Sequence, residues 1–265
     1  MAKPGANQRL PMPDVSRPEH NLAVRTVASL LIPLVRLSFK IRLRGAENLP
    51  KTGSYILAGN HCTELDGLAL AYVVYKRLHR TPHFFAKGSL FTIPVIGKIL
   101  LKAGQIPIYR GGRSNEEPLR AANLYLNDGQ VVGIFPEGTL TREPNLWPMR
   151  GKFGAVKLAL DNNVPLYVFG QFGTEKVMPQ YTKRFRPGFW KPVDFVIGHE
   201  VNLDRFRNER AGAAEMLEAT EMVMREITKL VEEIRGEKAP AELFDPAKHG
   251  IAETGNFKKH EKGKK

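Results

Sequence analysis

The sequence predicts an α/β fold in which short buried strands alternate with helices. Three apolar runs have the length and the polar or Gly-rich bounds of buried strands: Ser54–Gly59, Val131–Phe135 and Val164–Phe169. Segments of helical character lie between them, and this alternation is typical of α/β domains. The chain has 265 residues, 42% of them apolar, which is enough to build a packed core.

The first part of the chain predicts a loose leader followed by a membrane-surface segment. Residues 1–18 are polar and Pro-rich, whereas residues 19–45 contain the apolar segment Leu22–Leu43. Its uninterrupted apolar part is shorter than the about 20 residues that span a bilayer, and basic residues interrupt and flank it. We therefore expect amphipathic helices on a membrane surface, bent near Pro33. An ordinary core helix of a soluble domain is the alternative.

Residues 46–235 are expected to form the α/β domain. The additional elements expected there are helices at Leu68–Leu78, Glu117–Asn127 and Phe153–Leu160 and a strand at Ile106–Tyr109. Pro107 cannot donate a ladder hydrogen bond, so we expect that strand at an edge. The apolar and basic stretch Phe84–Ala103 fits either a surface that meets lipid or a core element with exposed lysines.

The C-terminal part predicts one long helix and a tail. Apolar residues recur at sevens along Ala213–Arg235, which predicts a helix with a wide packed face. A stripe of this width is expected to be core, so it indicates no chemistry. Residues 236–265 are polar and Lys-rich and are expected to form a basic, disordered tail.

The charge and the motif content limit the function. The net charge of +13 indicates an anionic partner: nucleic acid, an anionic membrane surface or a phosphorylated substrate. The single cysteine, Cys62, permits no intramolecular disulfide. The sequence lacks the Gly-x-Ser-x-Gly, Walker and dinucleotide-binding patterns, which argues against a serine hydrolase, an NTPase and a dehydrogenase.

His61 and Asp66 are five positions apart, directly after the strand predicted at Ser54–Gly59. On a regular helix they would point about 140° apart, so they meet only if the backbone turns between them. If they meet, Asp66 fixes the tautomer of the imidazole and leaves its other nitrogen free to take a proton. Glu64 is an alternative partner by spacing, and a purely structural histidine is the plainer interpretation.

Two other reactive groups are expected to carry no chemistry. Cys62 follows His61, but neighbouring residues at a strand end point in opposite directions, so activation of the thiol is geometrically poor. His79 and His83 have the spacing of a zinc-binding pair, but Pro82 lies between them and no metal site is predicted.

Four ordered blocks carry the strongest likeness to known proteins. They are Asn60-His61-x4-Asp66, Gly104–Arg110 (GQIPIYR), Phe135–Thr139 (FPEGT) and Val164-Pro165-Leu166. In this order they resemble the glycerolipid acyltransferases, especially the 1-acylglycerol-3-phosphate acyltransferases of the PlsC type. The resemblance covers roughly residues 20–230. It implies one domain with a central mixed sheet flanked by helices.

The resemblance also implies a role for each matching residue. His61 would be the general base on the acceptor hydroxyl, and Asp66 would hold it. The residues expected to bind the acceptor are Arg110, Glu137, Gly138 and Thr139, with Lys87 and Arg142, and after them Arg150 and Lys152, added on charge alone. For Arg110 the chemistry agrees, because a guanidinium grips phosphate with two hydrogen bonds.

Glu137 needs a separate interpretation, because a carboxylate beside a phosphate repels it. We expect it to bond a glycerol hydroxyl or to pair with Arg110. The pairing predicts that Glu137→Gln raises the acceptor KM more than it lowers turnover.

The implied reaction transfers a fatty acyl chain from coenzyme A or acyl carrier protein to the hydroxyl of lysophosphatidic acid, giving phosphatidic acid. A thioester is already activated, so no cofactor or metal is expected. The expected partners are the two substrates, an anionic membrane surface and acyl carrier protein, with no nucleic acid. The expected location is the cytoplasmic face of the cell membrane, with peripheral or monotopic attachment. The alternatives are another lysolipid or glycerol-3-phosphate as acceptor, or a non-catalytic membrane- or nucleic-acid-binding protein.

Overall fold

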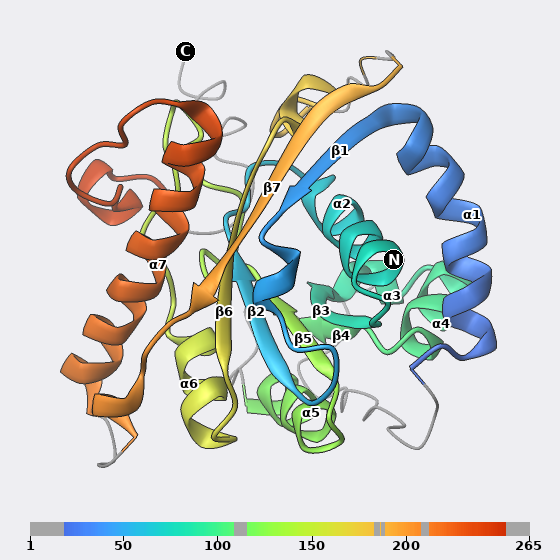
Figure 1. Ribbon diagram of the computed structural model, residues 1–265, viewed down its shortest axis with the longest axis horizontal. Helices are drawn as coiled ribbons and strands as arrows, with labels where there is room; N and C mark the ends of the chain where they lie inside the picture. The colour runs from blue at the N-terminus through green and yellow to red at the C-terminus, as the bar shows by residue number, and fades with distance from the viewer. Residues whose placement is uncertain (1–18, 109–115, 183–185, 187–188, 208–211, 253–265) are drawn as a thin grey trace.

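The computed structural model describes residues 19–108, 116–182, 186, 189–207 and 212–252. A seven-stranded sheet lies at the centre of this part of the chain (Figure 1). Its strands are β1 (Phe39–Arg44), β2 (Tyr55–Gly59), β3 (Pro82–Lys87), β4 (Ile106–Ile108), β5 (Val131–Ile134), β6 (Leu166–Phe172) and β7 (Lys191–Glu200). They lie in the order β1-β7-β6-β2-β5-β3-β4. The predicted α/β fold is confirmed, and β4 is the edge strand that Pro107 predicts.

The sheet is mixed, as predicted. Strand β6 pairs with β7 in the antiparallel sense, and every other neighbouring pair is parallel. Strands β2 to β6 therefore run in one direction, and β1 and β7 run in the other. The carboxyl ends of the five strands β2 to β6 meet along one side of the sheet, which we call the carboxyl edge. Ligands of open α/β sheets bind at such an edge.

Helices cover both faces of the sheet (Figure 1). Helices α5, α6 and α7 pack on one face, and α1 and α2 pack on the other. The helices are α1 (Leu22–Ser38), α2 (Asp66–Tyr72), α3 (Gly88–Phe91), α4 (Pro94–Lys102), α5 (Glu116–Asn127), α6 (Gly154–Asp161) and α7 (Ala213–Arg235). Short turns are η1 (Ala46–Asn48), a π-helical η2 (Val73–Arg77), η3 (Thr174–Lys176), η4 (Asp204–Phe206) and η5 (Pro246–His249).

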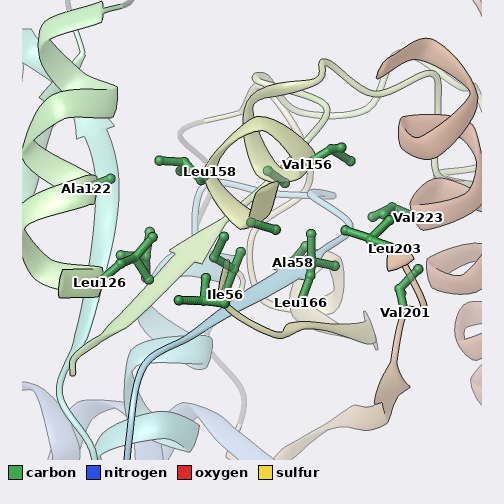
Figure 2. Close-up of a cluster of buried hydrophobic side chains, with 14 of the residues drawn as sticks. Ile56, Ala58, Ala122, Leu126, Val156, Leu158, Leu166, Val201, Leu203 and Val223 are labelled. Carbon is green, nitrogen blue, oxygen red and sulfur yellow. The ribbon is translucent and has the colours of Figure 1, made fainter. Parts of the chain in front are cut away.

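The central strand β2 is buried along its whole length. Because successive strand residues face opposite sides, Ile56 and Ala58 enter the cluster beneath α5, α6 and α7 that Figure 2 shows. Tyr55 and Leu57 enter the second cluster, beneath α1 and α2. Burial on both faces fixes the register of β2 and hence the place where the chain leaves the sheet toward His61.

The expectation of helices throughout residues 19–45 is wrong for its last part. Helix α1 begins after the Asn21 cap, continues through Pro33 and ends at Ser38. Residues 39–44 form β1, the edge strand beside β7. The sequence FKIRLR alternates apolar and basic residues, and this period of two is typical of a half-buried strand. No helix in the described part of the chain is both long enough and apolar enough to cross a membrane.

The expected C-terminal tail is also partly wrong. Residues 236–252 are described, and they return to the body of the protein: Phe244 forms a bridge with Met149, and Asp245 binds Arg150 at 2.9 Å. The apolar and basic stretch at residues 84–103 contains the end of β3 and the short helices α3 and α4. Residues 1–18 and 253–265, which include the expected leader, lie outside the described residues.

Candidate active site

His61 and Asp66 meet at the carboxyl edge. His61 lies two residues beyond β2, and Asp66 is the first residue of α2. The His61 Nδ1 atom lies 3.0 Å from Asp66 Oδ2, so the predicted turn between them is confirmed. Glu64, the alternative partner, is exposed. The His61 side chain keeps 21% of its surface exposed, so the imidazole is reachable from outside.

Asp66 is fully buried and hydrogen-bonded on both carboxylate oxygens. Its Oδ2 accepts from the amides of Cys62 at 2.5 Å and Thr63 at 2.8 Å. Its Oδ1 accepts from the hydroxyls of Thr63 at 3.0 Å and Thr174 at 2.5 Å. A carboxylate so placed accepts a hydrogen bond from Nδ1–H of His61, which leaves the Nε2 lone pair free to take a proton.

Thr174 is a site residue that the sequence does not reveal. It lies at the start of η3, beyond β6, 108 positions from Asp66. Asn60 and Gln171 tie the ends of β2 and β6 together just before the site, because the Gln171 amide donates to Asn60 Oδ1 at 2.8 Å and Asn60 Nδ2 donates to the Gln171 carbonyl at 2.9 Å. These partners are distant along the chain, so no local pattern indicates them.

The backbone of His61 is held on both sides by the segment that follows β5. Its amide donates to Glu137 Oε1 at 2.7 Å, and its carbonyl accepts from the Thr141 amide at 2.7 Å. Its ring stacks on Phe135 with the ring centroids 4.2 Å apart. The FPEGT block therefore holds the imidazole in place.

Glu137 does not occupy the predicted substrate-contacting position. It is buried, and its second carboxylate oxygen accepts from the Met149 amide at 3.2 Å. Both oxygens thus bind backbone within the protein, which contradicts a contact with a glycerol hydroxyl. Arg110, the other predicted partner, lies outside the described residues. Glu137 is instead a positioning residue for His61.

Replacing Glu137 with glutamine is therefore expected to lower turnover rather than to raise the acceptor KM. The glutamine side chain has only one oxygen that accepts hydrogen bonds, so its NH₂ group must face the backbone amide of His61 or of Met149. Two donors then oppose each other, and the backbone around His61 is expected to shift. We expect kcat to fall at least about tenfold and the free energy of unfolding to fall by about 1–3 kcal/mol. Steady-state kinetics and denaturant unfolding measure both. A raised KM with unchanged kcat would contradict the positioning role.

The Glu137 carboxyl also predicts a pH dependence of stability. Burial raises the pKa of Glu137 from 4.5 to about 8. Hydrogen bonds from the amides of His61 and Met149 and from the Thr141 hydroxyl lower this pKa, but the effect of burial is larger. The native state thus holds this proton more tightly than the unfolded chain does. The resulting stabilisation is complete below the unfolded pKa and is lost as the pH rises through about 8. In denaturant unfolding at several pH values, the stability advantage of the parent over Glu137→Gln is expected to narrow across this range; a constant advantage would contradict it.

Gly138 and Thr139 shape the turn beside Glu137. Gly138 has φ +67°, a left-handed conformation that glycine adopts without strain, and its amide donates to the Phe135 carbonyl at 2.9 Å. Thr139 is buried behind this turn. The exposed Lys152 side chain lies against Gly138. A substrate contact of Gly138 or Thr139 stays a prediction.

The predicted cationic residues divide into exposed and buried groups. Lys87 is exposed at the end of β3, at the carboxyl edge. Arg142 is buried; its guanidinium donates to the Tyr181 hydroxyl and lies 5.2 Å from the centre of that ring. Contact between the buried Arg142 and the acceptor stays a prediction. The exposed Arg150 is bonded to Asp245.

Cys62 lies in a setting that suits the expected bystander role. Burial raises the pKa of its thiol well above the usual value, and the nearby Asp66 and Glu137 carboxylates raise it further. We expect Cys62→Ala to keep most of the activity and to lower the free energy of unfolding by about 1–2 kcal/mol, the cost of a small cavity. Initial rates and thermal unfolding test this. Complete loss of activity in folded protein would support a covalent mechanism instead.

His83, one member of the histidine pair considered for zinc, is engaged with other protein groups. His83 is buried, with Nδ1 2.9 Å from the Gly104 carbonyl oxygen and Nε2 2.5 Å from Gln130 Oε1. Both ring nitrogens therefore have protein partners. In the described ranges no group of three or more His, Cys, Asp or Glu side chains is placed to hold a metal ion.

Comparison with known proteins gives the same family as the motif blocks. A family model described as Acyltransferase matches residues 40–169. A chloroplastic 1-acyl-sn-glycerol-3-phosphate acyltransferase of Brassica napus is 32% identical over 143 residues, which cover 53% of this chain and 40% of the relative. The Bacillus subtilis enzyme of the same name is 32% identical over 142 residues, covering 52% of this chain and 66% of the relative.

The fold has a solved counterpart. The crystal structure of the 1-acyl-sn-glycerophosphate acyltransferase PlsC from Thermotoga maritima superposes with a TM-score of 0.62 at 22% identity, over 82% of this chain and 81% of that one. This likeness concerns the fold alone. The residues that the family model matches include the His61–Asp66 pair and the FPEGT block, and these two motifs meet at the carboxyl edge. The chain therefore belongs to the acyltransferase family that includes the 1-acyl-sn-glycerol-3-phosphate acyltransferases.

Proposed function

We propose that this protein transfers a fatty acyl chain from an acyl thioester to the free hydroxyl of lysophosphatidic acid and so forms phosphatidic acid. The observation that carries the proposal is the 3.0 Å contact between His61 Nδ1 and the buried Asp66, with the imidazole partly exposed at the carboxyl edge. The names of the relatives support this acceptor.

In the proposed reaction, the oxygen of the acceptor hydroxyl attacks the thioester carbonyl carbon while His61 Nε2 takes the hydroxyl proton. The buried Asp66 carboxylate stabilises the imidazolium that forms. The carbon–sulfur bond then breaks, and the thiolate of coenzyme A or acyl carrier protein takes the proton from His61. The thioester is already activated, so these steps require no cofactor.

Exposed cations near the carboxyl edge fit a phosphorylated acceptor. Lys87 ends β3 there, and Lys152 lies against the turn at Gly138. We propose that Lys87 contacts the acceptor phosphate and that Arg110, which follows β4 in the sequence, does so as well. Lys152 is a further candidate.

We further propose peripheral or monotopic attachment to the cytoplasmic face of the cell membrane. Leu30, Leu34 and Leu37 are exposed on α1. Their spacing places them along one side of the helix, where they can enter a lipid interface. Fractionation without detergent tests this, because full solubility at both physiological and high salt would contradict it.

The substrates are tested by offering purified protein a mixture of lysolipids and glycerol-3-phosphate with acyl coenzyme A or acyl carrier protein. Mass spectrometry identifies the acceptor, the donor and the chain length together. Phosphatidic acid is the expected product. Acylation of glycerol-3-phosphate or of another lysolipid without phosphatidic acid would overturn the proposed acceptor, and no ester with any pair would overturn the proposed activity.

A further inference from the structure

Two adjacent aromatic side chains project from the protein at the start of β7. Phe189 is 79% exposed and Trp190 is 67% exposed, and we call this pair the aromatic tip. Two consecutive aromatic side chains with most of their surface exposed contribute little to packing. An exposed apolar cluster of this kind marks a surface that meets a partner or a membrane.

The aromatic tip is joined to α1. The Trp190 amide donates to the carbonyl of Leu37 at 3.2 Å, and Leu37 is the last of the exposed leucines on that helix. In Figure 1 the C-terminal end of α1 and the start of β7 lie together at the upper right. The aromatic tip therefore lies beside the C-terminal end of α1, where the exposed leucines of that helix end.

The aromatic tip also stands at the carboxyl edge. Because β7 is antiparallel to β6, it begins where β6 ends, and Asp194 pairs with Phe172, the last residue of β6. Thr174, whose hydroxyl donates to Asp66, lies two residues after the end of β6. A surface that contacts the tip thus faces the same side of the sheet as His61.

The backbone of Trp190 is held in an uncommon conformation. Its φ is +57°, in the left-handed region that a bulky side chain rarely adopts. This conformation costs free energy, and a side chain that is 67% exposed regains little of it by packing in the protein. A strained backbone that holds a tryptophan side chain in solvent is expected where this side chain contacts something other than the protein itself.

Exposed basic residues occur in the segments next to the aromatic tip. Arg36 and Lys40 are exposed on either side of the junction between α1 and β1, and Arg186 is exposed three residues before Phe189. Tryptophan beside lysine and arginine is the combination that favours the headgroup region of an anionic bilayer. We propose that Phe189 and Trp190 insert into an anionic lipid surface together with the leucines of α1. The tip thereby sets the orientation in which the carboxyl edge meets its lipid acceptor, a role that rests on the proposed function.

Tryptophan fluorescence tests the insertion directly, because the chain has two tryptophans and the other one, Trp147, is 4% exposed. Vesicles of phosphatidylglycerol and phosphatidylcholine are expected to shift the emission to the blue, and brominated lipid is expected to quench it. Trp190→Phe, which retains only Trp147, is expected to show neither effect. An unchanged parent spectrum while the protein sediments with the vesicles would overturn the proposal.

Vesicle binding by a double variant tests the contribution of the tip. Phe189→Ala with Trp190→Ala is expected to weaken binding at least about tenfold. The control is Leu217→Ala, which removes a side chain 46% exposed on α7, on the opposite face of the sheet from α1. Equal binding by the parent and the double variant, or equal weakening by the control, would overturn the proposal.

Activity separates this proposal from the proposed function. With lysophosphatidic acid in vesicles the double variant is expected to lose activity in proportion to its binding, whereas in detergent micelles it is expected to match the parent. If the double variant loses activity equally in micelles and in vesicles, then the aromatic tip acts in the reaction or in the fold, and the proposed lipid role is overturned. If the parent acylates no acceptor, the proposed function fails, and the fluorescence result still decides whether the tip enters lipid.

Discussion

Replacing His61 with alanine is expected to lower acyl transfer at least about 100-fold while the protein stays folded. The variant loses the only group proposed to take the acceptor proton, the imidazole next to the buried Asp66. Its backbone bonds to Glu137 and Thr141 do not depend on the side chain. The lost stacking on Phe135 costs about 1 kcal/mol, which leaves the fold intact.

The measurement is the initial rate with lysophosphatidic acid and an acyl thioester, with circular dichroism and thermal unfolding of the same preparations. A fall in kcat without a matching rise in KM is the expected form of the loss, since the base acts in the transition state. Undiminished ester formation by the folded variant would remove the basis of the proposed mechanism.

Asp66→Asn is expected to lower turnover by about 100- to 10,000-fold. The asparagine oxygen can take the place of Oδ2 and accept from Cys62 and Thr63, while its NH₂ group replaces Oδ1 beside the hydroxyl of Thr174. Hydroxyl groups can rotate to accept, so the loop keeps its shape. What is lost is the negative charge that stabilises the His61 imidazolium.

The matched control is Glu64→Gln, which removes an exposed carboxylate two residues away. Its turnover is expected to stay within about twofold of the parent, because a charge in water contributes little at this distance. Turnover and thermal unfolding of both variants show which carboxylate serves His61. If Glu64→Gln loses as much turnover as Asp66→Asn, then Asp66 is not the residue that serves His61.

The sequence predicts the central elements of this fold because their signals are local. The buried run at β2, the helix α5 and the heptad pattern of α7 each lie within one short window. The edge strand β1 and its neighbour β7 are not predicted. For β1 the alternating FKIRLR pattern was present, but the apolar segment before it extended the expected helix across it.

The sequence predicts the reactive pair of the candidate site but not the residues that hold this pair in place. His61 and Asp66 are close in sequence, so a turn suffices to bring them together. Glu137 binds the His61 amide from 76 positions away, and Thr174 binds Asp66 from 108 positions away. Contacts of this kind depend on strand order, which spacing does not determine. The resemblance alone placed Glu137 at the substrate, whereas its carboxyl group binds the backbone amides of His61 and Met149.

The pairing of the first strand with the last has a consequence for synthesis. Arg42 of β1 and Asp194 of β7 are hydrogen-bonded 152 positions apart. A nascent chain therefore exposes α1 on the ribosome well before the partner of β1 has been made. Throughout that interval the edge of β1 is unpaired, a state prone to aggregation, and the neighbouring helix is free to meet lipid. Early attachment to a bilayer would shelter the unfinished sheet until its closing strand arrives.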